Sequence, residues 1–371
     1  MLPDDARLVS INDHLVEPPD LWGGHDDQPH VESIDGEERW VIGTESLTVQ
    51  ALSVLGTGAG RAAGAERRNQ ATRVSEMHPA VSDPNARVQS MDLDGVAVQT
   101  LLPHVIGFAG ERLRFLREPE ARLRAVRRYN DFVLREFCAS APDRLVGVAI
   151  MPLHDLQKAA EELLRCAAIG ARAVSLPHAP QLIGLPGFGD ESWARLFAVA
   201  EEAALPVLIH VGSSGAPPSI VDAGSPGAML VQGGFDVANA MIDLLYAYVL
   251  VRYPRLRLVL IEGGIGWMPY VIDRIEFFAR QRPEAWSPPS RERAPGDIVR
   301  EQVHVSFIDD ILGLTMIDAV GAGPVHWQCD FPHADSPWPH SRASLAAQLA
   351  DIDSGTARGI AGANTAALLN L

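Results

Sequence analysis

Short runs of apolar and β-branched residues recur along the chain, and each run ends in polar residues. Eight such runs are present, at residues 7–12, 95–102, 144–150, 171–176, 205–210, 257–262, 302–307 and 324–330. The apolar character within a run is continuous, whereas a strand with one face in water would alternate apolar and polar positions. We therefore expect eight strands that are buried on both faces, as in a parallel sheet covered by helices.

The segments between these runs have the spacing of helices. Residues 111–141 carry apolar positions at helical intervals, and residues 156–170 end in Gly170, which suits a helix C-terminal cap. Strands that alternate with helices over this length fit the α/β class and, within it, a (β/α)8 TIM barrel. A doubly wound open sheet is the main alternative, but no G-x-G-x-x-G follows the first strand.

A long stretch from about Pro18 to Arg87 departs from this pattern. It is rich in Gly, Pro and charged residues, and only WVIG (40–43) and SLTVQALSVL (46–55) resemble strands. We interpret it as a loop region inserted after the first strand, which a barrel would place over the catalytic face as a cap. A second Gly- and Pro-rich loop, residues 211–234, follows the fifth strand and is expected to border the same mouth. Residues 1–371 are interpreted as one domain.

Composition narrows the range of partners. The formal net charge of −16 repels phosphate backbones, so we expect a small-molecule substrate and no nucleic acid. No apolar run approaches the roughly 18 residues that cross a bilayer, and the first residues do not resemble a signal peptide, so we expect a cytoplasmic protein without membrane contact. Cys138, Cys166 and Cys329 are isolated in apolar segments and are interpreted as structural.

Residues with metal-binding or acid–base side chains end four of the predicted strands. Asn12 and His14 end the first strand, His210 the fifth, Glu262 the sixth and Asp330 the eighth. The C-terminal ends of barrel strands converge on one mouth, so these residues are expected to meet. Imidazole nitrogen and carboxylate oxygen suit one divalent ion, with zinc expected first and manganese or iron as alternatives.

Structural explanations compete with this one at each position. A single histidine that closes a strand is often only a hydrogen-bonded cap, and for His14 alone the two roles weigh equally. Glu262 is harder to explain structurally, because a carboxylate that follows LVLI and precedes two glycines is costly to desolvate unless a cation or donors receive it. Glu17 precedes two prolines, and its carboxylate could equally hold that loop or serve the site.

Further side chains on the predicted mouth are candidates for substrate binding. A single polar residue at such a position, including Asp309 or Asp310 after the seventh strand, is more often a loop or cap residue than a substrate-binding one. His333 is the stronger case because it follows Asp330 closely. Several aromatic residues could line a pocket or pack in the core, namely Trp22, Trp40, Phe108, Trp267 and Trp338. The substrate-binding candidates are Glu17, His104, His178, His333 and Trp338.

Six segments of the sequence together resemble one enzyme family. They are NDHLVEPPDLW, MDLDGVAVQTLLP, YNDFVLREFCASAPDRLVGVAIMPL, PVLIHVGS, LVLIEGGIGWMPYVIDRIE and CDFPHADSPWP, and they are spread over nearly the whole chain. In these segments the chain resembles the amidohydrolase-related family typified by aminocarboxymuconate-semialdehyde decarboxylase and γ-resorcylate decarboxylase. The resemblance implies a (β/α)8 barrel that is often a homodimer, one divalent metal, and small carboxylate or aromatic substrates.

The resemblance also implies roles for individual residues. His14 matches the second member of the strand-one metal motif, His210 the strand-five ligand and Asp330 the strand-eight carboxylate. Asn12 stands where relatives have His, Glu or Asp, and its amide oxygen is a weak neutral ligand. Glu262 stands where the family has a histidine. Ser175 ends strand four in place of a lysine, so one metal is expected instead of a carbamate-bridged pair.

Three functional hypotheses remain open at this point. The leading one is hydrolysis, in which a metal held by His14, His210 and Asp330 activates water and Asp330 or Glu262 manages protons. The second is non-oxidative decarboxylation or another C–C bond reaction, in which Arg112 or Arg114 would hold the departing carboxylate. The third, motivated by Asn12 and Glu262, is a metal-free barrel that binds a ligand or works through carboxylates alone.

Overall fold

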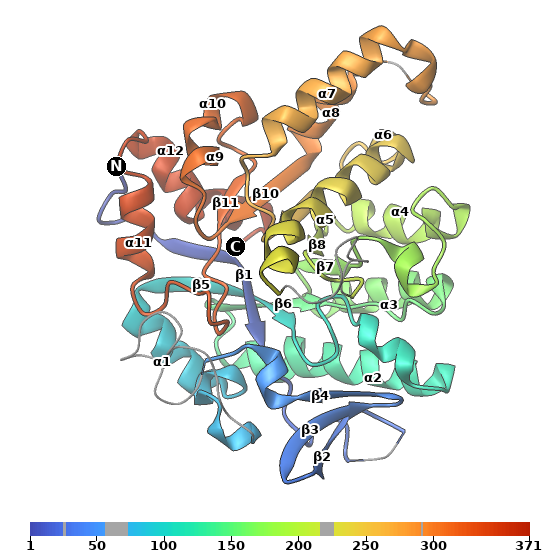
Figure 1. The fold of residues 1–371 in the computed structure, drawn as a ribbon, viewed down its shortest axis with the longest axis vertical. Coiled ribbons are helices and arrows are strands. Elements are labelled where there is room, and N and C mark those ends of the chain that lie inside the picture. The colour runs from blue at the N-terminus through green and yellow to red at the C-terminus, as the bar shows by residue number, and fades with distance from the viewer. Residues whose placement is uncertain (25–26, 56–72, 216–225, 291) are drawn as a thin grey trace.

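The computed structural model describes residues 1–24, 27–55, 73–215, 226–290 and 292–371. Its main sheet has eight parallel strands in the order β1-β5-β6-β7-β8-β9-β10-β11, with helices around them (Figure 1). The strands are β1 (Leu8–Leu15), β5 (Val96–Pro103), β6 (Leu145–Ala149), β7 (Ala173–Leu176), β8 (Val207–His210), β9 (Leu258–Ile261), β10 (Val303–Phe307) and β11 (Val325–Trp327). All eight predicted runs are strands, and the predicted (β/α)8 barrel is confirmed.

The first and last strands meet through the residues that follow β11. The Asp330 N–H donates to the Asn12 carbonyl at 2.9 Å, and the His14 N–H donates to the Phe331 carbonyl at 2.7 Å. These two backbone bonds close the barrel at its C-terminal end. Asn12, His14 and Asp330 therefore lie on the closing seam of the barrel.

Burial explains why the strands read as continuous apolar runs. Every residue of β1, β6, β7, β8, β9 and β11 is buried. Side chains such as Val9, Ile11, Val148 and Leu208 form one apolar cluster, and a larger cluster includes the side chains of the surrounding helices. Because both faces of each strand are covered, alternation of apolar and polar residues is not required.

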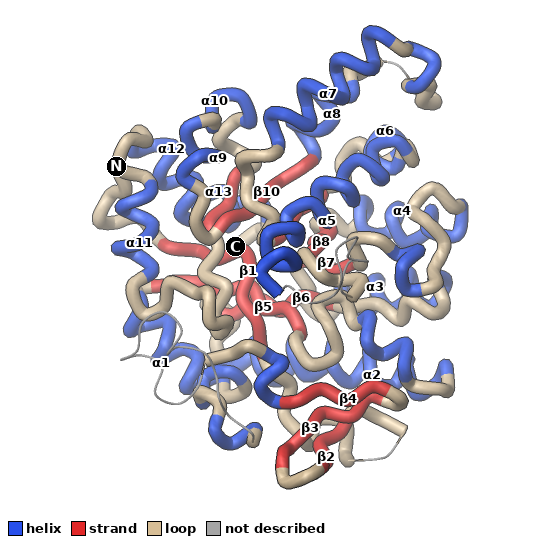
Figure 2. Tube along the Cα trace, viewed as in Figure 1, coloured by secondary structure: helices blue, strands red, loops and turns tan. Residues whose placement is uncertain are grey.

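Thirteen α-helices lie in the described part of the chain and surround the strands (Figure 2). They are α1 (Pro84–Asp94), α2 (Pro119–Asp131), α3 (Leu156–Ala168), α4 (Ala194–Glu202), α5 (Pro226–Tyr246), α6 (Val249–Arg252), α7 (Met268–Gln281), α8 (Pro295–Gln302), α9 (Ile311–Thr315), α10 (Ile317–Val320), α11 (Ser341–Gln348), α12 (Ser354–Arg358) and α13 (Asn364–Leu368). Gly170 follows α3 with φ +99°, as expected of a C-terminal cap.

The predicted helical segment 111–141 is not continuous. It begins with the 3-10 helix η6 (Glu111–Phe115) and continues with α2, the π-helix η7 (Phe132–Phe137) and the 3-10 helix η8 (Cys138–Ser140). Pro119 is the first residue of α2, and a proline restricts the residue before it, Glu118, to the extended backbone that the structure shows. The proline therefore separates η6 from α2.

The insertion after β1 is more ordered than a loop. It contains an antiparallel sheet of β2 (His30–Ile34), β3 (Glu37–Ile42) and β4 (Glu45–Thr48). Asp35 and Gly36 join β2 to β3, with φ values of +54° and +84°, as a two-residue hairpin turn requires. The interpretation as an irregular loop was therefore wrong for this part, and residues 56–72 of the predicted cap lie outside the described residues.

Only part of SLTVQALSVL forms a strand. Its first three residues end β4, and the 3-10 helix η1 (Val49–Leu52) follows. After η1 the chain bonds to the loop that follows β11: the Leu55 N–H donates to the Pro332 carbonyl at 2.8 Å, and the Ala334 N–H donates to the Ser53 carbonyl at 3.0 Å. The insertion therefore lies against the C-terminal end of the barrel, as expected for a cap.

The predicted loop 211–234 is shorter than expected at its C-terminal end. Helix α5 begins at Pro226. Its first turns include the glycines at 227, 233 and 234, from which a loop had been predicted. Gly234 contacts Gly263 of the loop after β9, where a Cβ on Gly234 would lie 2.9 Å from the Gly263 carbonyl oxygen. Close packing explains that glycine, and residues 216–225 of the predicted loop lie outside the described residues.

The hairpin turn between β3 and β4 docks the cap on the barrel through Gly43. Gly43 has φ +59°, and a Cβ on this residue would lie 2.0 Å from the Phe115 carbonyl oxygen. We expect Gly43→Ala to destabilise the protein by about 3 kcal/mol, since it adds both backbone strain and a clash. Chemical denaturation measures the loss. Gly36→Ala is the matched control, because Gly36 has φ +84° but open space around it, so equal losses would contradict the docking argument.

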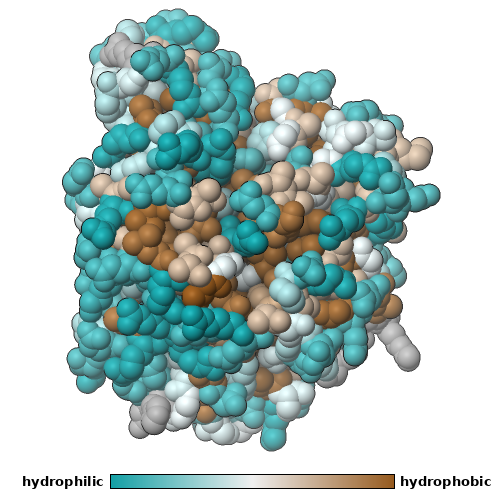
Figure 3. All heavy atoms as spheres, turned by 180° about the vertical axis from the view of Figure 1, so that it is seen from behind, coloured by the Kyte–Doolittle hydropathy of each residue, from teal (hydrophilic) through white to brown (hydrophobic). Residues whose placement is uncertain are grey.

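Seen from behind, polar residues lie mostly around the edge of this face, and apolar residues form patches across its middle (Figure 3). Among the described helices, none has both the length and the apolar character needed to span a bilayer.

Candidate functional site

Four side chains from different strands meet at the C-terminal end of the barrel. His14 belongs to β1, His210 ends β8, Glu262 follows β9 and Asp330 follows β11. One potential ligand atom of each lies within 4.8 Å of the others. The register of the sheet contributes, because His210 pairs with Ile261 and so lies beside Glu262. The structure thus brings together the residues that were predicted from the strand ends.

The cluster is tight and almost wholly buried. His14 Nε2 lies 3.2 Å from Asp330 Oδ1, and His210 Nε2 lies 2.8 Å from Glu262 Oε2. His14, His210 and Asp330 are at most 1% exposed, whereas the Glu262 side chain is 24% exposed. Glu262 is therefore the member of the cluster that reaches the surrounding solvent or a substrate.

Asn12 lies beside this cluster. Its Nδ2 is 3.3 Å from Asp330 Oδ1 and 3.4 Å from His210 Nε2, and its Oδ1 points elsewhere. In this orientation the amide donates to two of the candidate ligands. Asn12 would have to rotate about its terminal bond to offer an oxygen to a cation.

The donor set fits a divalent cation. Within the described residues, Asn12 Oδ1 is buried without a hydrogen-bond partner, and His14 Nε2 and Glu262 Oε2 lie close to Asp330 and His210 without a well-aligned hydrogen bond. Unpaired buried polar atoms are costly unless something outside the protein receives them. Burial, followed by the charges of His333 and His210, holds the pKa of His14 well below its usual range, and neutral imidazole is the form that binds metals.

Glu262 and Asp330, the two carboxylate residues of the cluster, both have a backbone conformation that is rare for residues other than glycine. Glu262 has φ +67° and Asp330 has φ +59°, in the left-handed region that costs a non-glycine residue about 1–2 kcal/mol. Hydrogen bonds hold both: the Glu262 N–H donates to Ser306 Oγ at 3.0 Å, and the Asp330 N–H donates to the Asn12 carbonyl. Strained residues of this kind concentrate at functional sites, which supports a functional reading of both carboxylates.

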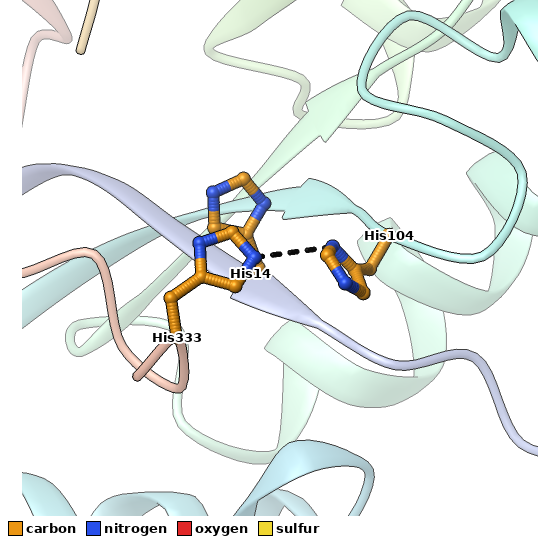
Figure 4. Close-up of side chains that lie close together, drawn as sticks. All are labelled: His14, His104 and His333. Atoms are coloured by element: carbon orange, nitrogen blue, oxygen red, sulfur yellow. Dashed lines mark hydrogen bonds between the residues drawn. The ribbon is translucent and has the colours of Figure 1, made fainter. Parts of the chain in front are cut away.

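A second group of histidines adjoins the cluster (Figure 4). His333 Nδ1 lies 2.9 Å and 3.0 Å from the two oxygens of Asp330, and its Nε2 lies 3.3 Å from His104 Nδ1. His104 Nε2 lies 2.6 Å from the Leu52 carbonyl, which can only accept. The rings of His14 and His333 are tilted by 34°, with centroids 4.2 Å apart, and one ring nitrogen each of His14, His104 and His333 lies within 4.8 Å of the others.

The direction of these hydrogen bonds follows from the carbonyl. His104 Nε2 must donate to Leu52, and burial lowers the pKa of His104 well below its usual range, so its Nδ1 accepts from His333 Nε2–H. His333 then carries hydrogen on both ring nitrogens. Burial disfavours that charged form, but the adjacent Asp330 carboxylate outweighs it and raises the pKa of His333 to about 9. A proton is thus held next to Asp330.

Arg87, the last residue of the predicted insertion, holds the backbone next to the site through hydrogen bonds. It is fully buried in α1, and its guanidinium donates to the Ala80 carbonyl at 2.7 Å, to Gln99 Oε1 at 3.1 Å and to the His14 carbonyl at 2.5 Å. It also lies over the Phe331 ring, 4.7 Å from the centroid. Arg87 therefore positions both sides of the closing seam.

The structure separates the predicted substrate-binding residues. Glu17 is buried, and its carboxylate accepts the backbone N–H groups of His104, Val105 and Ile106 at 2.8–3.4 Å, so it anchors the loop after β5. Trp338 is also buried and donates from Nε1 to the Ser90 carbonyl at 3.0 Å. These two side chains are engaged in packing beneath the mouth.

His178 lies near the mouth but makes no close contact with the cluster. Its backbone N–H donates to Ser213 Oγ at 2.9 Å, and its Nε2 is 3.8 Å from Asp236 Oδ2. Asp310, also on the predicted mouth, accepts the N–H groups of Ile265 and Gly266 at 2.6 and 2.9 Å and so holds the loop after β9.

A cavity of about 560 Å³ opens above the cluster. Phe108 and Glu262 line it, and the Phe108 ring lies 4.0 Å from the His210 ring, centroid to centroid. Arg112, Arg114 and Asp236 also line it. Asp236 was not predicted, because it lies just after the segment 211–234 that was interpreted as loop, and its place on α5 is what directs it to the mouth. Phe108 was predicted only as a possible lining residue.

The sequence of the chain is similar to a known family and to a known enzyme. A family model described as "Amidohydrolase" matches residues 30–371. A γ-resorcylate decarboxylase of Rhizobium sp. (strain MTP-10005) is 25% identical over 273 residues, which cover 69% of this chain and 78% of that protein.

Solved structures share the fold. The structure of an amidohydrolase from Mycobacterium avium subsp. paratuberculosis K-10 has a TM-score of 0.78 and 21% identity, and the match covers 100% of this chain and 99% of that one. A dihydroxybenzoic acid decarboxylase from a Polaromonas species, solved with bound manganese and the inhibitor 2-nitroresorcinol, has a TM-score of 0.63 and 18% identity, with coverage of 99% and 97%. At these identities the likeness supports the barrel alone.

Proposed function

Because the chain belongs to the amidohydrolase family, we propose that it catalyses the metal-dependent, non-oxidative decarboxylation of a small aromatic carboxylate. The observation that carries the proposal is the buried group of His14, His210, Glu262 and Asp330, whose atoms converge without enough partners of their own. A relative named as a γ-resorcylate decarboxylase supports the type of reaction. The hydrolysis that led the sequence-based hypotheses has less support, since the Rhizobium relative at 25% identity is a decarboxylase.

We propose that His14, His210 and Asp330 hold one divalent ion, with Glu262 as a further ligand. A divalent ion held by these residues would supply Lewis-acid polarisation of the bound substrate. Manganese is present in the Polaromonas relative, whereas the sequence favours zinc. Elemental analysis of protein purified without added metal identifies the ion, and protein with no bound divalent ion would support the metal-free alternative instead.

The residues around the cavity suit an aromatic substrate. The Phe108 ring lines the cavity beside His210 and offers a flat apolar surface on which a substrate ring can pack. The cap and the loop after β11 are bonded to each other over the buried cluster, which limits the access of water. A low local dielectric strengthens the interactions of the charged groups with the substrate.

The reaction requires one proton at the ring carbon. When the bond to the carboxyl carbon breaks, its electron pair stays on the ring carbon, carbon dioxide leaves, and the ring carbon takes up a proton. The Asp330–His333 pair is placed to provide it, because His333 Nδ1–H donates to both Asp330 oxygens. His104 keeps His333 in place from the other side. Glu262, which faces the cavity, would accept a proton from a hydroxyl group beside the substrate carboxylate.

Glu262→Gln tests the proposed proton acceptor. The amide keeps the shape and one oxygen but cannot accept a proton at neutral pH, so we expect turnover to fall about a hundredfold while bound metal is kept. Steady-state kinetics and metal analysis of the same preparations measure both. Asp236→Asn is a matched control on the same cavity, and equal turnover of wild type and Glu262→Gln would remove Glu262 from the reaction.

Product analysis tests the function itself. The purified enzyme is incubated with hydroxylated benzoates and with unsaturated carboxylates, and carbon dioxide and the remaining ring are quantified. We expect equal amounts of the two, and no release after treatment with a chelator. Release of an amine or alcohol without carbon dioxide would favour hydrolysis. The predicted homodimer and cytoplasmic location remain predictions, and analytical ultracentrifugation tests the first.

A further inference from the structure

A second cavity of about 260 Å³ lies beside the catalytic one. It is enclosed by η6, α2 and the loops that follow β6 and β7, at the same end of the barrel. Glu111 and Arg114 line both cavities, so they form the wall between them. None of His14, His210, Glu262 and Asp330 lines this second cavity.

The polar groups of the second cavity are mostly basic. Arg114 and Arg122 line it together with His154. The Arg122 Nε donates to the Leu116 carbonyl at 2.8 Å, which fixes the plane of the guanidinium. Among the described residues, no hydrogen bond or ion pair is found for the two terminal nitrogens of Arg122, although the chain as a whole carries a net charge of −16.

His154 adds an unsatisfied donor to the same cavity. Its Nε2 is buried and has no hydrogen-bond partner in the described part of the chain. Burial, followed by the charge of Arg122, lowers the pKa of His154 and favours the neutral ring, whose tautomer with hydrogen on Nε2 can donate into the cavity. A buried donor without a partner is costly, and a bound acceptor would remove that cost.

The remaining walls are apolar. Leu113, Val126, Met151 and Leu153 are buried, and Ile183 and Leu185 complete the lining. Burial raises the pKa of Glu111 to about 7, and its Oε2 accepts the Ala109 N–H at 3.0 Å. The cavity therefore combines the guanidinium of Arg122, whose terminal nitrogens are without a partner among the described residues, with an apolar surface.

We propose that this cavity is a second binding site, separate from the metal centre, for a small monocarboxylate with an apolar body. The carboxylate would pair with Arg122 and accept from His154, since guanidinium groups match the planar geometry of a carboxylate. The apolar body would lie against Leu113, Val126 and Met151. A volume of about 260 Å³ is at the small end for ligand pockets, which suits a single ring or a short aliphatic acid.

Benzoate binding to the metal-free protein tests this site apart from the proposed catalysis. After chelation, isothermal titration calorimetry is run with benzoate and with benzamide, its neutral counterpart. We expect one equivalent of benzoate to bind and benzamide to bind at least tenfold more weakly. Arg122→Met should weaken benzoate binding about tenfold or more. Arg124→Met is the control, since Arg124 is exposed on the same helix and pairs with Asp27.

Two further variants separate the sites. Leu185→Trp fills the second cavity and should abolish benzoate binding, whereas Asp330→Asn alters the metal centre and should leave it unchanged. Absence of saturable binding would overturn the proposal, as would equal binding by Arg122→Met and wild type. Binding that is lost in Asp330→Asn would place benzoate at the metal centre instead. Equal affinity for benzamide would show an apolar pocket without carboxylate recognition.

Discussion

Asp330→Asn is expected to lower decarboxylation about a thousandfold while the protein still folds. The substitution keeps the size of the side chain but removes the negative charge that contacts His14 at 3.2 Å and His333 at 2.9 Å. It removes a candidate metal ligand and, at the same time, the carboxylate that holds the proton of His333 in place for the ring carbon. Carbon dioxide release under single-turnover conditions measures the chemical step, and elemental analysis measures the bound metal.

A matched variant separates the charge of Asp330 from a general effect on its loop. Asp335 lies five residues further along the same loop and is exposed, so Asp335→Asn should keep nearly full activity. If Asp330→Asn also kept normal turnover, Asp330 would have no catalytic role. If it lost all metal, adding excess manganese or zinc would show whether any rate returns through the remaining ligands.

Arg87→Met is expected to destabilise the protein by about 3–5 kcal/mol. The substitution would leave the carbonyls of Ala80 and His14 and the Gln99 amide oxygen without their buried donor. It would also leave Asp13, whose pKa burial raises well above its usual range, without the positive charge that opposes this shift. Chemical denaturation followed by circular dichroism measures the loss.

The control for Arg87 is an arginine that makes no buried bonds. Arg117 is exposed between η6 and α2, and Arg117→Met should change stability by less than about 0.5 kcal/mol. Arg87→Lys keeps a positive charge but has fewer donors, so it should lie between wild type and Arg87→Met. Equal stability of all these variants would show that Arg87 does not hold the seam together.

The strands and the main ligands could be predicted from sequence because their signals are local. A run such as LVLI is buried on both faces, and this makes it continuous in apolar character. His14, His210 and Asp330 could be predicted to meet, since the ends of parallel strands converge in a barrel. The structure brings these three side chains together as expected.

Other features depend on contacts between distant loops, which no local pattern encodes. His104 and His333 are 229 positions apart and are brought together by the loops after β5 and β11. Glu17 could be read as a functional or a structural residue, and only the three backbone N–H groups around it distinguish the two. Arg87 looked like the end of a polar insertion, although it is fully buried in α1.

One error could have been avoided from the sequence. Asp35 and Gly36 form a dipeptide typical of tight hairpin turns, and residues that pair across it flank it on both sides. That signal predicts the β2–β3 hairpin, but the high content of charged residues in the segment favoured a loop. The start of α5 at Pro226 is harder to predict, because a proline and several glycines precede and begin that helix.

The closing seam of the barrel has a consequence for biosynthesis. Asn12 and His14 leave the ribosome more than 300 residues before Asp330 and Phe331, which bond to their backbones. A nascent chain therefore cannot assemble the complete cluster until Asp330 has been translated. During that interval the early histidines are available to any metal ion or chaperone in the surroundings, and a truncated product that stops before Asp330 would lack the means to close.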